Sequence, residues 1–452
     1  MSMKIIILGV GKVGSTLAES FCAEGHEVCI IDQNEKKITE YVNKIDVEGV
    51  AGNGLNGNIL IEAGILDADC FIATTSWDET NILSCVLAKK LGAKFTIARV
   101  RAPEYFDDIG NLREHLGLDM IFNPERRTAY DIFKVLKFPS AESIENFAGG
   151  KALLIKFEIK KGNPIIGKTL IQTSKEYGNK ILFGVVVRNG KSLIPKGDFV
   201  VEEDDEVYII GSEDEITAFT KALKIFKHRI KHVLIIGANT ISHYLAKELM
   251  SEGVDVTVIE NDQEKCNKFS QELVGVNVVC GDGTNHDVLN EEGLKTAGAL
   301  VTLTDIDEQN IIISLYAKES QGIKTVTKMD KDAMESIIKS LGLDSVVSPR
   351  ISIANHIIAF VRSHQEHATE ELCSLYKITS SIEAMEFKVS KNFDCKDKLL
   401  KQIKLKSKIL IGGIVREGEF ILPSGDSVIK ENDRVIVISA EKGISELNDI
   451  LR

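Results

Sequence analysis

The chain has 452 residues, enough for two to four domains, and its 44% hydrophobic and 27% charged residues are typical of a globular protein with ordinary buried cores. This composition excludes an intrinsically disordered chain. The formal net charge of −12 argues against nucleic acid as a partner, because binding to phosphates depends on clustered Lys and Arg.

The eight cysteines include no C-x-x-C pair, which favours reduced thiols in a cytosolic protein over a disulfide framework. The apolar run that opens the chain is too short for a signal peptide, and no segment approaches the about 20 apolar residues of a membrane helix. We therefore expect a soluble chain that takes part in membrane processes only through a partner.

The opening segment predicts a nucleotide site. An apolar run, Ile5 to Leu8, predicts a buried strand, and glycines with G-x-G-x-x-G spacing follow it at Gly9, Gly11 and Gly14. A helix pattern then begins at Val13. In such a fingerprint the first glycine makes a tight turn, the second lets a pyrophosphate approach the backbone, and the third lets helix and strand pack closely. The N–H groups at the helix N-terminus face the phosphates.

An acidic residue follows the glycine fingerprint at the expected distance. The second apolar run, Glu27 to Ile31, ends in Asp32, 18 residues past Gly14. An acid about 20 residues beyond the last glycine accepts hydrogen bonds from an adenosine ribose. Strand, glycines, helix and acid together therefore predict a genuine nucleotide site.

The chain then alternates between strand and helix patterns. Further strands are predicted at Asp46 to Ala51, Cys70 to Ala73, Phe95 to Val100 and Met120 to Phe122. Helices are predicted at Asp78 to Leu91 and Glu125 to Leu136, followed by a linker from Lys137 to Gly150. Such alternation indicates an α/β domain with a parallel sheet covered on both faces. From Lys151 the pattern changes to short alternating strands with Gly turns (Ala152 to Ile159, Ile181 to Arg188 and Val207 to Ile210), which predicts a small α+β domain.

The second half of the chain repeats the first. Gly237 falls 228 residues after Gly9, and Glu260 falls 228 after Asp32. Arg188 and Asp205 recur at the same offset as Arg416 and Asp433. We therefore predict a tandem duplication of one two-domain unit, here called copy one and copy two. The predicted domains are a Rossmann-like domain at 1–136, a linker and small domain at 137–225, a second Rossmann-like domain at 226–362, and a linker and small domain at 363–452.

Polar residues follow several predicted strands of copy one, at the sheet edge where open α/β sheets bind ligands. Asn53 can contact a ribose or base, and the hydroxyls of Thr74 and Thr75 can reach phosphate or sugar. Arg99 can donate two parallel hydrogen bonds to a phosphate, the alternative being an arginine on a solvated face. Glu125, after Pro124, can hold a divalent cation against phosphates, the alternative being that Pro124 simply starts the last helix.

Copy two retains only part of this site. Its second and third glycines are replaced by Asn239 and Ser242, and the Asn side chain stands where a pyrophosphate needs bare backbone. Thr304 matches the Thr74 loop. We expect the second site to bind weakly, differently or not at all.

Catalytic patterns are scarce. The histidines lack metal-ligand spacing, and Tyr130 with Lys134, which imitates a short-chain dehydrogenase pair, is more simply one face of a helix. We therefore predict no enzyme activity, with an NAD-dependent oxidoreductase as the alternative that fold analogy alone would favour. A nucleic-acid-binding repressor is disfavoured by the acidic charge and by the lack of a helix-turn-helix segment.

Together these motifs resemble the RCK (KTN) nucleotide-binding domain. The resemblance rests on the glycine fingerprint and on five further segments, namely Asp32, Gly52 to Gly54, Ala68-Asp69, Ala73 to Asn81 and Ile97 to Arg101. The whole chain, with two RCK-N/RCK-C units in tandem, is similar to the peripheral regulatory subunits of Trk-type potassium uptake systems. Some RCK-C domains bind regulators such as cyclic dinucleotides.

The resemblance implies a function in potassium transport. RCK proteins bind NAD(H), ATP or ADP and assemble a ring under an ion-conducting membrane protein, so a homo-oligomeric gating ring, dimer or tetramer, peripheral on the inner face of the membrane, is expected. The implied nucleotide contacts are Gly9, Val10, Gly11, Lys12, Val13, Gly14, Asp32, Asn53, Thr74, Thr75 and Arg99, with Glu125 a cation ligand in an ATP-bound form. A tentative second site comprises Gly237, Ala238, Asn239, Thr240, Ile241, Glu260 and Thr304. Which nucleotide activates stays open.

Overall fold

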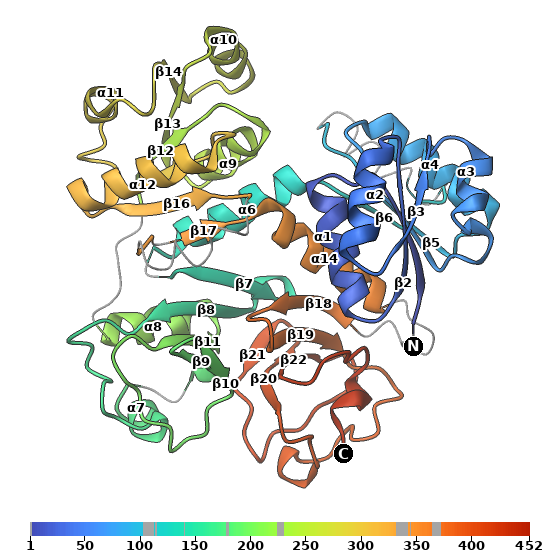
Figure 1. Ribbon diagram of the computed structural model, residues 1–452. Coiled ribbons are helices and arrows are strands. Elements are labelled where there is room, and N and C mark those ends of the chain that lie inside the picture. Colours follow the sequence, from blue (N-terminus) through green and yellow to red (C-terminus); the bar gives the residue numbers. More distant parts are fainter. Residues whose placement is uncertain are drawn as a thin grey trace. The chain divides into compact units, whose positions relative to one another are not determined.

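The first part of the chain forms a six-stranded parallel sheet (Figure 1). The computed structural model describes residues 2–102, 113, 115–139, 141–177, 180–223, 230–330, 342–343, 345–363 and 372–452. The strands of this sheet are β1 (Lys4–Leu8), β2 (Glu27–Asp32), β3 (Glu48–Ala51), β4 (Cys70–Ala73), β5 (Phe95–Arg99) and β6 (Met120–Phe122). Their order is β3-β2-β1-β4-β5-β6, so the order reverses between β1 and β4, where α/β sheets bind ligands. The predicted α/β fold with a parallel sheet is confirmed.

Helices follow these strands and cover the sheet. They are α1 (Lys12–Ala23), α2 (Glu35–Lys44), α3 (Gly57–Glu62) and α4 (Asp78–Leu91), with a 3-10 turn η1 (Ile65–Asp67). Strand residues Ile6, Leu8 and Phe71 pack with Cys85 and Ala88 of α4, all of them almost completely buried. The central residues of β1 and β4 are apolar and buried, as expected where both faces of a parallel sheet are covered.

Copy two builds the same sheet. Its strands are β12 (His232–Ile236), β13 (Asp255–Glu260), β14 (Asn277–Cys280), β15 (Ala299–Thr302), β16 (Lys324–Lys328) and β17 (Ser345–Val347), in the order β14-β13-β12-β15-β16-β17. The helices are α9 (Thr240–Ser251), α10 (Gln263–Glu272), α11 (His286–Glu291) and α12 (Asp307–Gln321). The predicted duplication of the Rossmann-like domain is therefore confirmed.

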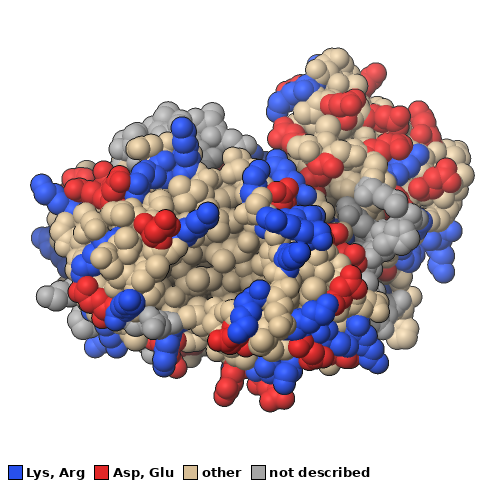
Figure 2. Space-filling view, turned by 90° about the horizontal axis from the view of Figure 1, so that it is seen from below, with Lys and Arg blue, Asp and Glu red and all other residues tan. Residues whose placement is uncertain are grey.

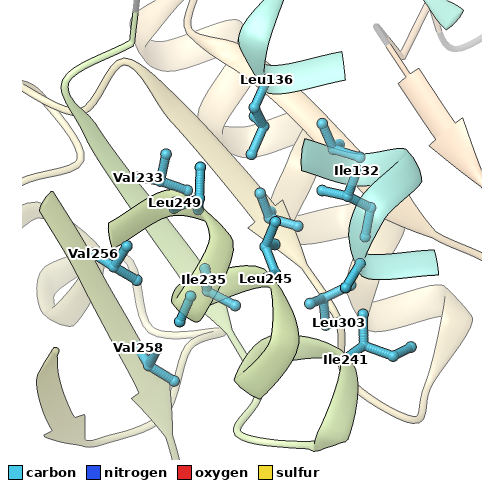
Figure 3. Close-up of a cluster of buried hydrophobic side chains, with 14 of the residues drawn as sticks. Ile132, Leu136, Val233, Ile235, Ile241, Leu245, Leu249, Val256, Val258 and Leu303 are labelled. Carbon is cyan, nitrogen blue, oxygen red and sulfur yellow. The ribbon is translucent and has the colours of Figure 1, made fainter. Parts of the chain in front are cut away.

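The last helix of copy one, α6 (Pro124–Lys137), packs in the core of the second Rossmann domain. Its residues Ile132 and Leu136 point toward Val233 of β12 and Leu245 of α9 (Figure 3). The chain divides into two compact units, one containing Met1–Thr128 with Ser348–Val361 and the other Ala129–Val347 with Arg362–Arg452. The predicted end of the first Rossmann-like domain at residue 136 included almost all of α6 in that domain. In the structure, α6 belongs to the second unit from Ala129 onward.

The last helix of copy two makes the reciprocal exchange. Most of α14 (Pro349–Ser363) belongs to the first unit (Figure 1). Its final residues lie in the second unit, and the Arg362 guanidinium makes a buried ion pair with Glu383, N–O 2.8 Å. Each Rossmann sheet is thus completed by a helix from the other copy.

Two five-stranded antiparallel sheets form the small domains. The first has the order β10-β9-β11-β8-β7 and comprises β7 (Ser143–Phe147), β8 (Ala152–Glu158), β9 (Leu182–Arg188), β10 (Lys191–Leu193) and β11 (Glu206–Gly211). With it are η2 (Ala148–Gly150), α7 (Leu170–Tyr177) and α8 (Glu213–Ala222). The prediction that Lys137 to Gly150 is a linker is wrong for β7, because Ile144 and Phe147 are buried and the strand pairs with β8.

The second small domain has the sheet order β18-β19-β22-β20-β21. Its elements are β18 (Leu372–Lys377), β19 (Glu383–Lys388), η4 (Leu400–Gln402), β20 (Ile409–Arg416), β21 (Glu419–Ile421), β22 (Arg434–Ser439) and η5 (Leu447–Ile450). The two small sheets share one apolar core, in which Leu154 and Ile210 pack with Ile436 and Ile438. The predicted α+β domains are confirmed.

The repeated Arg and Asp residues of the small domains form matching ion pairs. Arg188 Nε lies 2.7 Å from Asp205 Oδ1, and Arg416 Nε lies 2.8 Å from Asp433 Oδ1. Both carboxylates are buried and both pairs are bidentate. The hydrogen bond that Arg188 donates to Asp205 raises the pKa of Arg188. The recurrence of these residues at one offset therefore has a structural cause.

The surface carries charges of both signs. On the face shown in Figure 2, Lys and Arg are interspersed with Asp and Glu, and neither sign covers a broad area among the described residues. Within the described part of the chain, no helix has the length and apolarity needed to cross a membrane.

Candidate functional site

The glycine fingerprint of copy one forms the tight turn between β1 and α1. Gly9 has a φ of +95°, and a Cβ there would come within 3.0 Å of the Thr75 backbone nitrogen. A Cβ on Gly14 would lie 2.0 Å from the Gly9 carbonyl oxygen, so only glycine allows α1 to approach the strand this closely. These contacts agree with the packing functions expected of the first and third glycines.

The second glycine faces open space. A Cβ on Gly11 would meet nothing within 4 Å, and no side chain caps α1 at this residue. The first N–H groups of a helix lack partners inside the helix and carry a partial positive charge. The neighbouring Val10 and Val13 are buried, whereas Lys12 is exposed. The backbone at Gly11 is therefore accessible, and its contact with a phosphate stays a prediction.

Asp32 lies beside this turn. Its two carboxylate oxygens accept hydrogen bonds from the backbone N–H groups of Val10 and Asn34, each at 2.9 Å. Each carboxylate oxygen has two lone pairs, so Asp32 can still accept hydroxyl protons from a ribose. The carboxylate thus positions the glycine turn and stays available to a ligand.

Thr74 and Thr75 use their hydroxyls within the protein. The buried Thr74 Oγ1 donates to the Gly9 carbonyl oxygen at 2.8 Å, and Thr75 Oγ1 donates to Asn81 Oδ1 at 2.7 Å. Both residues lie at the glycine turn, as their sequence positions predict, but both hydroxyl protons are directed at protein oxygens. Ligand contacts from these hydroxyls stay a prediction.

Asn81, which the sequence analysis did not single out, organises the loop after β4. Its side chain is completely buried, and its Oδ1 accepts from the Thr75 backbone N–H at 2.8 Å. Its Nδ2 donates to the carbonyl oxygens of Thr75 and Arg99, at 3.1 and 3.0 Å. Asn310, 229 residues later, makes the same set of bonds in copy two. This recurrence of a polar residue one position beyond the 228-residue repeat spacing was a signal in the sequence.

Arg99 and Glu125 form an ion pair at the carboxyl end of β5. The Arg99 Nη2 atom lies 3.1 Å from Glu125 Oε1, and both side chains are largely buried. Arg99 Nε and Glu125 Oε2 are buried and have no hydrogen-bond partner. Burial lowers the pKa of Arg99, and the Glu125 charge opposes this shift. A guanidinium with an unused donor in a dry site is suited to a phosphate oxygen.

Glu125 alone does not fit a divalent cation. Its Oε1 is already paired with a guanidinium, and the described residues contain no group of three or more His, Cys, Asp or Glu that could hold a metal ion. Magnesium prefers several oxygen ligands in octahedral geometry, and a nearby positive charge opposes its binding. We therefore assign no metal to this position.

Asn53 lies in the loop after β3 and is exposed. Its Oδ1 accepts from the Leu55 backbone N–H at 3.0 Å, and Asn56 in turn caps α3 by accepting from Asn58. This bond uses the amide oxygen of Asn53, and the amide nitrogen is a donor by its chemistry. Its predicted contact with ribose or base stays a prediction.

In copy two the corresponding helix end is capped by Asn239. The Asn239 Oδ1 accepts from the backbone N–H groups of Ile241 and Ser242, at 2.9 and 3.1 Å. The Ser242 hydroxyl donates to the Gly237 carbonyl oxygen and so replaces the contact that Thr74 makes in copy one. The N–H groups that a pyrophosphate would need are therefore already satisfied.

The remaining residues of the second site keep the geometry of the first. Glu260 accepts from the backbone N–H groups of Ala238 and Asp262, at 2.8 and 3.0 Å, as Asp32 does from its two partners. Thr304 Oγ1 donates to Asn310 Oδ1 at 2.8 Å, and Thr240 is the first residue of α9. The chemistry has changed at the helix end, where Asn239 provides a cap, and in the loop after β14, where Asp282 stands at the position of Asn53.

A cavity of about 190 Å³ opens at this second site. Its lining includes the carboxylates of Glu260, Asp282 and Asp305 but only one lysine, Lys265. Lys328, at the position of Arg99, is tied to Asp330 at 3.5 Å and donates to the Thr304 carbonyl oxygen. Carboxylates repel phosphate, so the cavity disfavours a nucleotide with a pyrophosphate.

Comparison with known proteins matches the duplication. The family model of the TrkA-N domain matches residues 5–124 and 233–349, and that of the TrkA-C domain matches 154–224 and 384–452. Along its full length the chain is 33% identical, over 453 residues, to a Trk system potassium uptake protein TrkA homolog of Archaeoglobus fulgidus, which is also covered completely.

The chain belongs to the TrkA family. A second member, the Trk system potassium uptake protein TrkA of Vibrio alginolyticus, is 29% identical over 446 residues that cover 97% of this chain and 96% of the relative. The TrkA-N matches include both glycine turns, and the TrkA-C matches include both buried Arg–Asp pairs. The TrkA architecture of two TrkA-N/TrkA-C units thus accounts for the internal repeat.

Solved structures share this TrkA fold. The match to the crystal structure of the GsuK RCK domain covers 98% of this chain and 93% of that one, at a TM-score of 0.63 and 18% sequence identity. The GsuK channel bound to NAD is similar over 98% of this chain and 78% of that one, at a TM-score of 0.63 and 19% identity. The predicted RCK fold is therefore confirmed.

Proposed function

We propose that the chain is the cytoplasmic regulatory subunit of a Trk-type potassium transporter and that it binds NAD(H) or an adenine nucleotide at the glycine turn of copy one. The observation that carries the proposal is the end of α1, which has no side-chain cap and faces open space at Gly11, with Asp32 beside it. Membership of the TrkA family supplies the transport context.

The residues of copy one fit a nucleotide. Phosphates bind to the N–H groups at the start of α1, and the unused Nε donor of Arg99 provides a further charge-assisted contact. Asp32 accepts hydrogen bonds from a ribose. GsuK structures with NAD and with ADP bound support this ligand class for a related fold.

Helix α6 supplies a route from this site to the rest of the chain. It begins at Pro124, next to Glu125 and its partner Arg99, and its later residues Ile132 and Leu136 are buried in the core of the second Rossmann domain. A phosphate that binds Arg99 weakens the Arg99–Glu125 pair, and a rigid helix carries the resulting shift to that core. The ligand acts as a switch if it binds two shapes of the assembly with different affinity.

The partner in this proposal is the potassium-conducting membrane subunit, reached by the chain on the inner face of the membrane. The chain acts in a homo-oligomeric ring, a dimer or tetramer, as is usual for closed symmetric assemblies. A change in ring shape, produced by nucleotide binding, is transmitted to the membrane subunit. No bond of the nucleotide is broken, so the proposal requires no enzyme activity and no nucleic acid.

The contacts of Tyr130 and Lys134 do not favour the oxidoreductase alternative. The Tyr130 hydroxyl accepts from the Asn146 amide at 3.0 Å, and Lys134 Nζ pairs with Asp131 at 2.9 Å and Glu145 at 3.3 Å. These contacts hold α6 against β7, so Tyr130 and Lys134 have a structural function. Reduction of NAD by the purified chain with any candidate substrate would revive this alternative.

Calorimetric titration with NAD, NADH, ATP and ADP tests the nucleotide site. We expect about one site per chain in the wild type and none in Gly11→Asp, whose carboxylate would stand in the anion-binding position. Asn239→Asp is the matched control, because Asp is also a good helix cap and should leave the first site unchanged. If Gly11→Asp binds nucleotides as the wild type does, the proposed site is wrong.

Potassium uptake tests the regulatory function. Cells that depend on a Trk-type membrane subunit should lose uptake without this chain, regain it with the wild type, and regain it with altered nucleotide dependence in Gly11→Asp. The chain should also co-purify with that membrane subunit. Unchanged uptake without the chain, together with no association, would exclude the regulatory function even if a nucleotide binds.

A further inference from the structure

Two cysteines of copy two approach one another beside the second cavity. Cys266 is buried on α10, and Cys280 is exposed at the end of β14. The Cys266 Sγ donates to the Glu260 carbonyl oxygen at 3.3 Å, and Glu260 is the register partner of Cys280 across β13 and β14. The next residue, Gly281, donates its backbone N–H to the same carbonyl oxygen at 2.8 Å.

The Cys266 thiol and residue Cys280 therefore both adjoin Glu260, one from α10 and the other from the neighbouring strand β14. Burial raises the pKa of the Cys266 thiol, and the neighbouring Cys280 raises it further. One thiol is therefore open to solvent and has a second, protected thiol within reach.

Copy one lacks this pair. Ile38 and Ala51 occupy the equivalent positions on α2 and β3, so the repeated fold does not require thiols there. A different pair, Cys70 and Cys85, lies inside the first Rossmann domain, but both of its members are almost completely buried. Among the described cysteines, Cys280 combines exposure with a thiol neighbour.

We propose that Cys266 and Cys280 form an oxidation site that closes to a disulfide by exchange with a small-molecule disulfide. The Cys280 thiolate attacks one sulfur of the small disulfide, forms a mixed disulfide and releases one thiolate. The Cys266 thiolate then attacks the Cys280 sulfur and releases the second small thiolate. The two protons lost by the cysteines end on the two released thiols, so the cysteines are oxidised and the small disulfide is reduced.

The disulfide would join the wall of the cavity covalently. Cys266 follows Lys265, and Cys280 lies two residues before Asp282; both neighbours line the cavity together with Glu260. The bond therefore restrains α10 relative to the end of β14. Because Cys266 has a raised pKa, the closing step should speed up as the pH rises and more of the thiol becomes thiolate.

Peptide mapping by mass spectrometry tests the site after the native chain is incubated with oxidised glutathione and its remaining thiols are blocked. We expect a Cys266–Cys280 linked peptide that dithiothreitol releases, while Cys373, an exposed cysteine on β18, carries glutathione. Cys266→Ser should hold glutathione on Cys280, and Cys280→Ser should leave Cys266 reduced.

Two results would overturn the proposal. One is a wild-type chain that stops at the glutathione adduct on Cys280, and the other is a disulfide that links Cys280 to a cysteine other than Cys266. The measurement needs neither a nucleotide nor a membrane subunit, so it stands or fails independently of the proposed transport function.

Discussion

The two Rossmann domains of this chain are the same fold with different helix ends. Asp32 and Glu260 accept equivalent backbone bonds, and Asn81 and Asn310 organise equivalent loops. The start of α1 has no side-chain cap, whereas Asn239 caps α9 through two backbone N–H groups. A single residue type thus decides whether the helix end is available to a ligand.

This difference shows that the N–H groups at a helix N-terminus have two alternative uses. A side-chain cap satisfies them within the protein and stabilises the helix by about 1 kcal/mol. Without a cap, the same groups form an anion site. Copy one has no side-chain cap and leaves these groups accessible, whereas copy two caps them.

The largest expected effect concerns a part of the repeat that is equal in both copies. Asp205→Asn and Asp433→Asn each remove a buried charge that accepts two bonds from an arginine, Arg188 or Arg416. Each should lower local stability by about 3 kcal/mol, because the other charge loses its partner. Native-state hydrogen exchange on β11 and β22 measures this. If one substitution is silent, the two small domains are not equivalent.

The second largest expected effect is on nucleotide affinity, and it should differ between the two copies. Gly11→Asp should weaken nucleotide binding at least about 100-fold, or about 2.7 kcal/mol, because a carboxylate replaces the open approach to α1. Calorimetry measures the loss, and Asn239→Asp should leave the affinity of the first site unchanged. Equal losses in both variants would mean that copy two is a full site.

The buried amides test whether the shared loops have the same stability. Asn81→Ala and Asn310→Ala each leave backbone groups without partners, so each should cost about 2 kcal/mol of local stability. Hydrogen exchange at the loops after β4 and β15 checks this. Only Asn81→Ala should also reduce nucleotide affinity; a loss of affinity in Asn310→Ala would contradict the comparison.

Substitution of Asp32 and of Glu260 should have a smaller but still different effect on nucleotide affinity. Asp32→Ala should reduce nucleotide affinity about tenfold, roughly 1.4 kcal/mol, through the lost ribose contact. Glu260→Ala should leave that affinity within error, although the two carboxylates make matching backbone bonds. Titration of both variants against NAD and ATP decides the matter, and equal losses would place a nucleotide in both domains.

The smallest expected effect comes from removing the cap in copy two. Asn239→Gly should destabilise α9 by only a few tenths of a kcal/mol, because Gly is itself tolerated at this helix position. It should also free the N–H groups of Ile241 and Ser242 and raise nucleotide stoichiometry above that of the wild type. A wild type that already binds two nucleotides would show that the cap is no obstacle.

Much of the site was predictable because its signals are local. The spacing of Gly9, Gly11 and Gly14 and the position of Asp32 reflect a turn and a strand that are close together in the chain. The bonds of Thr74 and Thr75 were not predictable, since a hydroxyl can donate to a ligand or to a nearby carbonyl with equal chemical ease. The pairing of Arg99 with Glu125 depends on β5 and α6 meeting at one edge of the sheet.

The sequence by itself determined the duplication, the alternation of strands and helices, and the loss of glycines in copy two, because repeats and periodicity are written along the chain. Only the tertiary structure decided that α6 completes the second Rossmann domain and α14 the first. The apolar stripe of a helix records that one face must be buried but not which sheet buries it. The approach of Cys266 to Cys280 has the same cause, since β13 and β14 must pair before the two thiols can meet.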